Sequence, residues 1–200
     1  MKKGLMILIV LFLSACSTVK PTVTRYKLLS NDNKKVLNHA SKSCSDKTLS
    51  IPDSFSLASL KSSEMSYIES DDKIYSYLQA RWQESPNSFI TLEILKNIRE
   101  SKLFKTVQSS KSRGKSDFIL ENGIEDFMQY YDKEKNRLYV KVVITSTLVD
   151  THSKNVVASR TFSSRVEANE ISANGGVEAL SSALYKVLDK KIEWLEGVCR

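Results

Sequence analysis

The stretch that decides the fold is Leu138–Val149, with the sequence LYVKVVITSTLV. Its residues largely alternate between apolar and polar, and in a β-strand successive side chains point to opposite faces of the sheet. One face carries Leu138, Val140, Val142, Ile144 and Leu148, and the other carries Tyr139, Lys141, Thr145 and Thr147. This pattern predicts a strand in a sheet that has one buried face and one open face.

Further strand patterns lie on both sides of this stretch. Residues 117–131 and 156–166 are predicted strands, and the polar segments 132–136 and 150–154 have the length of hairpin loops. In residues 117–131 the even-numbered positions include the apolar or aromatic residues Phe118, Leu120, Ile124, Met128 and Tyr130, which alternation would place on one face. We therefore expect three consecutive antiparallel strands that share one buried face.

Shorter strands are predicted earlier in the chain. Residues 48–51 form one candidate, which ends at Pro52-Asp53. Residues 64–69 and 74–82 form a candidate strand pair across Ser70-Asp71-Asp72-Lys73, a sequence typical of a turn.

Two helical patterns complete the predicted domain. Ser85-Pro86-Asn87-Ser88 is typical of a helix start, and Phe89, Leu92, Leu95 and Ile98 follow at helical spacing. The second helix is predicted over residues 174–195, with Asn174 as its N-cap and an apolar stripe of Val177, Leu180, Leu184, Val187, Leu188 and Leu195. The predicted fold class is α+β, a two-layer sandwich in which a mostly antiparallel sheet is packed by two main helices.

The composition is that of one globular domain. The chain has 200 residues, of which 41% are hydrophobic and 26% are charged, and these values argue against wholesale disorder. Gly (6) and Pro (3) are scarce, which excludes collagen-like and linker-like classes. The length suffices for one well-cored domain and is too small for two.

The first sixteen residues carry a processing signal. Lys2 and Lys3 precede the apolar run Leu5–Leu13, which is too short to span a bilayer and has the length of a signal-peptide core. The run leads into Leu13-Ser14-Ala15-Cys16, which resembles the bacterial lipobox and predicts cleavage before Cys16. The alternative is an ordinary secretory peptide in which the cysteine occurs by chance.

The signal predicts how the chain is divided and where it resides. We expect residues 1–15 to be a lipoprotein signal peptide that is removed, residues 16–24 a lipidated tether, and residues 25–200 a single α+β periplasmic domain. Cys16 is the predicted lipid attachment site, and two acyl chains, palmitate among them, suffice for stable anchoring. Ser17 is the predicted sorting residue, because an aspartate at that position tends to retain lipoproteins at the inner membrane of enteric-type bacteria. The expected location is therefore the periplasmic face of the outer membrane.

The charge balance changes with processing. The full chain carries 30 basic and 23 acidic residues, and removal of Lys2 and Lys3 leaves 30 − 2 = 28 basic residues, or about +5. This positive charge can assist contact with anionic lipid headgroups. Nucleic acid is excluded as a partner by the compartment.

Cys44 and Cys199 remain as a pair once Cys16 has been used for lipid. An even pair in an oxidising compartment favours a disulfide, and these cysteines lie just before the first core strand and just after the last helix. We expect a bridge that joins both ends of the domain across 199 − 44 = 155 positions. Chain entropy sets a ceiling of roughly 4–5 kcal/mol on its stabilisation. The alternative is two free thiols.

The sequence offers little catalytic chemistry. The only histidines, His39 and His152, fall in polar loops, and the chain has no GxSxG, HExxH, P-loop or GxGxxG motif. Neither a nucleophile–base pair nor a Cys/His cluster for structural zinc can be assembled. We therefore expect no enzymatic activity, no cofactor and no metal.

Aromatic residues are the remaining candidates for a functional surface. Tyr75, Tyr77 and Trp82 cluster in and just after one predicted strand, and alternation places Tyr75 and Tyr77 on the same face. They are a candidate contact surface for a partner or for lipid. The alternative is that they pack in the core or on the sheet.

Several short motifs follow the lipobox in a characteristic order. They are Tyr26-Lys27-Leu28, Leu49–Pro52, Ile74–Tyr77 with Arg81–Pro86, Ser101–Val107, Leu148–Asp150, Ala158–Phe162 and Trp194-Leu195. With these motifs the chain from about residue 24 to residue 195 resembles the family of ABC-type transport auxiliary lipoprotein components. The resemblance implies a compact α/β domain that is held to the outer membrane.

The resemblance also implies partners and a function. Members of this family are associated with periplasmic MCE-domain proteins and with ABC permease/ATPase complexes that move phospholipids between the two membranes. The implied function is a non-enzymatic accessory that docks the MCE assembly at the outer membrane or receives lipid there. Membrane lipid would be contacted through the acyl anchor, and a homo-oligomer is left open.

The alternative function is that of an unrelated envelope lipoprotein that serves binding or assembly. A neighbouring operon that encodes a permease, an ATPase and an MCE protein would separate the two hypotheses.

Overall fold

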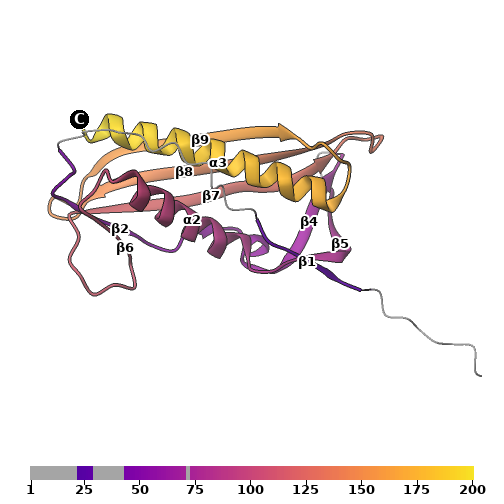
Figure 1. The fold of residues 1–200 in the computed structure, drawn as a ribbon, viewed down its shortest axis with the longest axis horizontal. Coiled ribbons are helices and arrows are strands. Elements are labelled where there is room, and N and C mark those ends of the chain that lie inside the picture. The colour runs from indigo at the N-terminus through magenta and orange to yellow at the C-terminus, as the bar shows by residue number, and fades with distance from the viewer. Residues whose placement is uncertain (1–21, 29–42, 71–72) are drawn as a thin grey trace, which may run out of the picture.

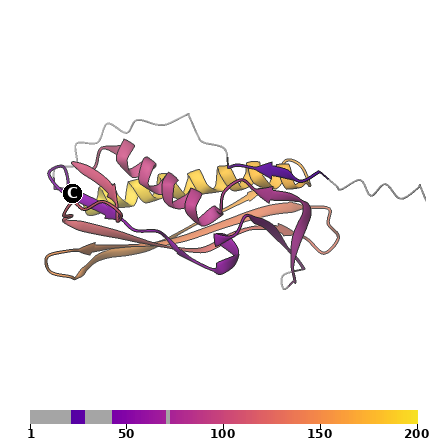
Figure 2. The same ribbon diagram turned by 90° about the horizontal axis from the view of Figure 1, so that it is seen from below.

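The computed structural model describes residues 22–28, 43–70 and 73–200. Within these residues a nine-stranded sheet forms one layer, and the helices α2 and α3 cover one of its faces (Figures 1 and 2). The predicted α+β class and its two-layer arrangement are confirmed. The elements in chain order are β1 (Thr24–Tyr26), β2 (Thr48–Ile51), β3 (Phe55–Ser56), the 3₁₀-helix η1 (Ala58–Lys61), β4 (Glu64–Glu69), β5 (Lys73–Trp82), α2 (Pro86–Ser101), β6 (Thr106–Ser109), β7 (Phe118–Tyr131), β8 (Leu138–Asp150), β9 (Val156–Glu167) and α3 (Ala173–Val198).

The strands β7, β8 and β9 form a long antiparallel meander, in which β9 is an edge strand of the sheet. The free edge of β7 receives β2, β3 and β4 in succession, all in parallel. β4 then pairs antiparallel with β5, while β1 adds to β5 and β6 adds to β2 in parallel. The sheet is therefore mixed, because its long ladders are antiparallel and most of its short ladders are parallel.

A β-bulge at Glu125 changes which residues of β7 face the helices. Ile124 pairs with Ile144 whereas Asp126 pairs with Val143, so that Glu125 is the extra residue. Beyond the bulge Phe127 and Gln129 are buried, while Met128 and Tyr130 lie on the opposite face. The prediction that placed these last two on the same face as Leu120 is wrong, because one extra residue shifts the alternation by one position.

The helix α3 packs mainly on β8 and β9. Its predicted apolar stripe is buried as expected. The helix is capped by Ser172, whose hydroxyl oxygen accepts a hydrogen bond from the Gly175 N–H at 3.1 Å. Asn174, the predicted cap, lies within the first turn instead and donates to Glu178. Gly176 presses against Gln129 of β7, where a Cβ atom would clash, and this allows the start of the helix to lie close to the sheet.

The helix α2 follows the Ser-Pro start signal closely. Ser85 accepts a hydrogen bond from the Ser88 N–H, and Pro86 occupies the first helical position. α2 contacts α3 through Glu93, which accepts hydrogen bonds at 2.8 Å from Tyr185 and from Lys96. None of the helices in the described segments is both long and apolar enough to cross a bilayer.

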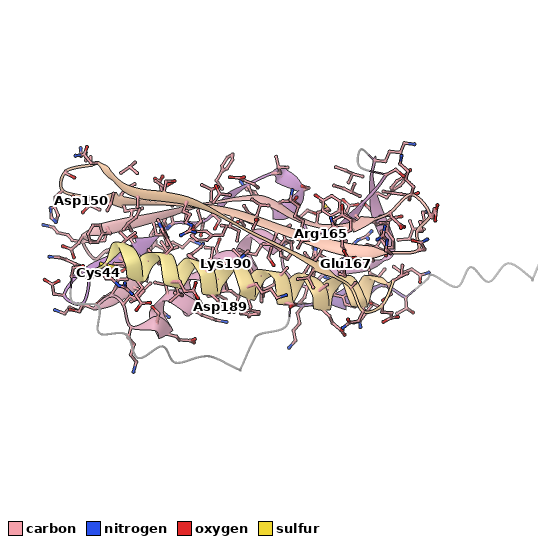
Figure 3. The ribbon with its side chains drawn as sticks, turned by 90° about the horizontal axis from the view of Figure 1, so that it is seen from above. Cys44, Asp150, Arg165, Glu167, Asp189 and Lys190 are labelled. Carbon is pink, nitrogen blue, oxygen red and sulfur yellow. A yellow bond between two sulfur atoms is a disulfide. The ribbon has the colours of Figure 1, made fainter. Side chains whose placement is uncertain are left out.

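The predicted disulfide between Cys44 and Cys199 is present, with 5.4 Å between the Cα atoms. It joins the segment that leads into β2 to the residue that follows α3. The Ser43 N–H also donates to the Cys199 carbonyl, at 3.3 Å. The C-terminal end of α3 is thereby fixed to the segment that precedes β2, and Figure 3 shows Cys44 at that end of the molecule.

A buried polar cluster lies between α3 and the sheet. Lys191 Nζ donates to Asn122 Oδ1 at 2.8 Å, and Ser146 Oγ donates to the same oxygen at 2.8 Å. Lys191 is only 1% exposed. Burial lowers its pKa to about 7, because the ammonium loses its hydration in the interior. The charged form of Lys191 therefore opposes folding.

We predict that Lys191 makes the folding stability rise between pH 7 and about pH 10. In this window the unfolded chain still holds the Lys191 proton, whereas the folded chain has released it. The unfolded state therefore binds more protons, and the free energy of unfolding increases with pH by at most about 1.4 kcal/mol per unit. Below pH 7 both states are protonated and the cost of burying the charge is fully present.

Urea unfolding of two variants at several pH values tests this prediction. Lys191→Met should be more stable than the parent protein below pH 7. Its free energy of unfolding should no longer rise between pH 7 and about pH 10. Lys190→Met is the control, because Lys190 is exposed and donates to the Ser163 carbonyl (Figure 3). The same pH slope in both variants would show that Lys191 is not the group responsible.

Candidate functional site

Tyrosines from three strands meet at the end of the molecule where β4 and β5 lie. Tyr67 of β4 is opposite Tyr75 of β5 in the hairpin, and the two rings stack with their centroids 5.6 Å apart. The Tyr67 ring also lies 4.7 Å from that of Tyr77 and 5.1 Å from that of Tyr131 on β7. We call these residues the tyrosine cluster: Tyr67, Tyr75, Tyr77 and Tyr131.

Hydrogen bonds hold the inner side of the tyrosine cluster to β7. The Tyr77 hydroxyl donates to Gln129 Oε1 at 2.8 Å and lies 2.8 Å from the Tyr131 hydroxyl. Burial, followed by the hydrogen bond to Tyr131, raises the pKa of Tyr77 far above its ordinary value. Burial also raises the pKa of Tyr131. Both hydroxyls therefore stay protonated, so they suit packing and recognition and do not suit the role of a base.

The outer side of the tyrosine cluster is accessible. Tyr75 is 42% exposed. Beside it Lys135, from the turn between β7 and β8, forms a 2.9 Å ion pair with Glu69 of β4. The hydrogen bond to Glu69 raises the pKa of Lys135, so the lysine stays charged. The result is an aromatic surface with a charged rim, which is the composition of many contact surfaces.

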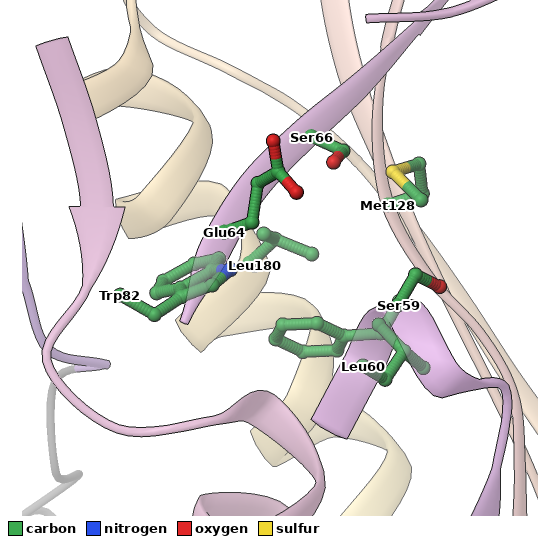
Figure 4. Close-up of a pocket in the computed structure, with 8 residues that line it drawn as sticks. Ser59, Leu60, Glu64, Ser66, Trp82, Met128 and Leu180 are labelled. Atoms are coloured by element: carbon green, nitrogen blue, oxygen red, sulfur yellow. The ribbon is translucent and has the colours of Figure 1, made fainter. Parts of the chain in front are cut away.

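Trp82 is a core residue, which corrects its assignment as a contact residue. It is 5% exposed and its ring packs 6.1 Å from that of Phe127. A cavity of about 10 Å³ lies beside it, lined also by Leu60, Met128 and Leu180 (Figure 4). This volume holds at most about one water molecule and cannot take an acyl chain.

The structure thus brings Tyr75 and Tyr77 together, as the strand alternation predicted, and adds two partners that the sequence analysis missed. A partial signal for Tyr67 was present in the predicted hairpin of residues 64–69 with residues 74–82. The observed register pairs Glu69 with Lys73, one residue away from the predicted turn, and this sets Tyr67 opposite Tyr75. The sequence held no such signal for Tyr131, since Tyr131 joins the tyrosine cluster through the parallel pairing of β4 with β7.

The other predicted site residues lie elsewhere. Cys16, Ser17 and His39 fall outside the described residues, so the lipid attachment and sorting roles of the first two stay predictions. His152 is on the exposed β8–β9 turn, with Nε2 3.6 Å from Asp117 Oδ1. The Thr48 N–H donates to Asp117 and lowers the pKa of that carboxyl, which indicates a structural role.

Metal chemistry finds no support in the described segments. Across residues 22–28, 43–70 and 73–200, no three His, Cys, Asp or Glu side chains are grouped so that they could hold a metal ion.

Comparisons with known proteins show the family and the fold of the chain. The family model described as the ABC-type transport auxiliary lipoprotein component matches residues 26–190. No curated protein matches the sequence. Among solved structures, protein XCC0632 from Xanthomonas campestris, of family model DUF330, is 16% identical with a TM-score of 0.70, and the match covers 89% of this chain and 93% of that one. The hypothetical protein CT253 from Chlamydia trachomatis is 10% identical with a TM-score of 0.50, over 77% of this chain and 98% of that one. At these identities the structural likeness shows the fold alone.

Truncating Trp82 and Tyr75 should have very different effects on stability. Trp82→Ala should lower the free energy of unfolding by about 3–5 kcal/mol, because it opens a cavity in the core. Tyr75→Ala should cost less than about 1 kcal/mol, because the ring is partly solvated and loses only one stacking partner. Urea unfolding measures both values. Equal losses would contradict the division into a core residue and a surface residue.

Proposed function

Because the chain belongs to the family of ABC-type transport auxiliary lipoprotein components, we propose that it is a non-enzymatic, membrane-anchored accessory of an ABC/MCE-type phospholipid transport system between the inner and outer membranes. The observation that carries the proposal is a family match over residues 26–190 that begins ten residues after a lipobox cysteine, 26 − 16 = 10. In this role the domain contacts a periplasmic MCE-domain protein and, through it, the ABC permease/ATPase complex.

The anchor places the domain at a membrane surface. Acylated Cys16 holds it to the periplasmic face of the outer membrane, and Ser17 permits sorting there. The disulfide between Cys44 and Cys199 supports an oxidising compartment such as the periplasm, since both cysteines are buried and bridged. Tethering raises the effective concentration of any partner that reaches the same surface.

The described geometry favours docking over lipid carriage. The cavity beside Trp82 is too small for an acyl chain. The accessible ring of Tyr75, with the Glu69–Lys135 ion pair at its rim, is suited to burial against another protein. We therefore assign the tyrosine cluster as the surface that meets the MCE partner.

The anchor is tested by labelling cells with a fatty-acid analogue. The parent protein should be labelled and Cys16→Ser should not, because the thiol is the acceptor. Ser17→Asp is the matched control, since it should keep the label and move the protein towards the inner-membrane fraction. If Cys16→Ser and the parent float equally with membranes, the lipoprotein assignment is wrong.

The partner surface is tested by co-purification of the MCE protein from membranes, with a melting curve for each variant. Tyr75→Ala should weaken partner binding by about tenfold or more, the effect of an interface anchor, while the fold survives. Val157→Ala is the control, because Val157 is comparably exposed but lies at the start of β9, near the disulfide end. Normal binding by folded Tyr75→Ala protein would remove the tyrosine cluster from consideration.

A further inference from the structure

The face of the β4–β5 hairpin opposite the tyrosine cluster exposes large aliphatic side chains. Leu78 is 86% exposed and Ile74 is 67% exposed. Tyr77 points to Gln129 on the helix side, so that the next residue, Leu78, points to the other side. Ile68 lies opposite Ile74 in the hairpin and is half-buried. We call Ile68, Ile74 and Leu78 the aliphatic patch.

Aromatic residues continue this surface across the sheet. Ile68 is in register with Tyr130, and Tyr130 is in register with Tyr139, whose ring stacks on that of Tyr130 at 5.0 Å. The Arg165 guanidinium lies 3.6 Å from the centre of the Tyr139 ring, on the half of the molecule away from Cys44 (Figure 3). Aliphatic side chains bordered by tyrosines and a cation are the composition found at membrane–water interfaces.

The chain that follows Cys16 enters the fold beside β5, the strand that holds Ile74 and Leu78. β1 runs parallel to β5 with Thr24 opposite Ala80, so the chain that leads into β1 approaches from the side of Leu78. The start of β1 and the β4–β5 hairpin lie at the same end of the molecule in both views (Figures 1 and 2). Cys16 precedes the first described residue by 22 − 16 = 6 positions. Six residues reach at most about 20 Å, so the anchor keeps this end near the bilayer.

We propose that the aliphatic patch docks the domain onto the bilayer that holds its anchor. Ile74 and Leu78 enter the interfacial layer, and Tyr130 and Tyr139 lie at the level of the headgroups. The proposal rests on the acylation of Cys16 within the proposed function. Docking of this face leaves the tyrosine cluster, on the opposite face of the same hairpin, free to meet a protein partner.

Insertion of apolar side chains is the main contribution to this contact. Arg165 pairs with Glu167 at 3.1 Å, and Lys141 pairs with Asp126 at 3.3 Å, so these cations are balanced. Docking should therefore depend little on salt or on the fraction of anionic lipid.

A polarity-sensitive fluorophore placed in the patch tests the proposal. In the acylated full chain Cys16 is blocked and Cys44 is bridged to Cys199, so that Ile74→Cys provides the site for a thiol-reactive probe. Val156→Cys is the matched control, because Val156 is 61% exposed and also β-branched. It lies beside the β8–β9 turn, whose Asp150 is at the Cys44 end in Figure 3. Both labelled proteins are reconstituted in phosphatidylethanolamine/phosphatidylcholine vesicles with brominated acyl chains, with and without phosphatidylglycerol.

The expected result is a blue shift and several-fold quenching of the probe at position 74 by the brominated lipid, with no change at position 156. Adding Leu78→Ser to Ile74→Cys should reduce the quenching, and a melting curve confirms that each variant is folded. Quenching should be similar with and without phosphatidylglycerol.

Each other outcome overturns the proposal in a recognisable way. Flotation of the protein without a change at position 74 rejects docking and leaves the anchor intact. If the probe shows no quenching but a blue shift that grows with the density of protein on the vesicles, the patch contacts a second copy of the chain and not the bilayer. Equal quenching at positions 74 and 156 shows unspecific adsorption. Failure to float rejects the anchor itself, and with it the proposed function.

Discussion

The structure depends above all on the packing of α3 along β8 and β9. Leu180, Leu184 and Leu188 are almost completely buried in this contact, and burial of such a side chain contributes roughly 1.5–3 kcal/mol. Without the helix, the apolar face of β8 would be exposed along its whole length. The contact is fixed at one end by the disulfide and at the other by the close approach of Gly176 to Gln129. It holds β7 in place, and β7 supplies the edge on which β2, β3 and β4 assemble.

This construction gives the molecule two different ends. At one end the disulfide joins the residue after α3 to the segment before β2, so that the helix cannot separate from the sheet there. At the other end the chain that follows the predicted anchor enters through β1, and the β4–β5 hairpin presents a tyrosine face and an aliphatic face. An anchored protein that works by contact needs a rigid body and an accessible surface near its anchor. In this fold the rigid end and the contact end are separated along the axis of α3.

Local sequence patterns predicted most elements but not the way in which they combine. The alternation in β8, the Ser-Pro start of α2 and the stripe of α3 are local signals, and each predicted its element. The bulge at Glu125 could not be predicted, because the sequence of the strand carries no signal that one residue is left out of the alternation. That extra residue turns Tyr130 to the opposite face of the sheet. The parallel pairing of β4 with β7 joins residues far apart in sequence, so Tyr131 could not be placed beside Tyr67. Regular alternation along β5 would place Trp82 on the same face as the exposed Leu78, yet the irregular pairing of β4 with β5 turns it into the core.

Hydrogen–deuterium exchange of the acylated protein tests most directly the claim that contact occurs at the tethered end. The exchange is compared in detergent, in vesicles, and in vesicles with the proposed MCE-domain partner. The predicted result is additional protection of backbone amides in β4 and β5, residues 64–82, first on membrane attachment and then on partner binding, with unchanged exchange near Cys44 and Cys199. Protection that appears at the disulfide end while β4 and β5 remain unaffected would contradict the claim.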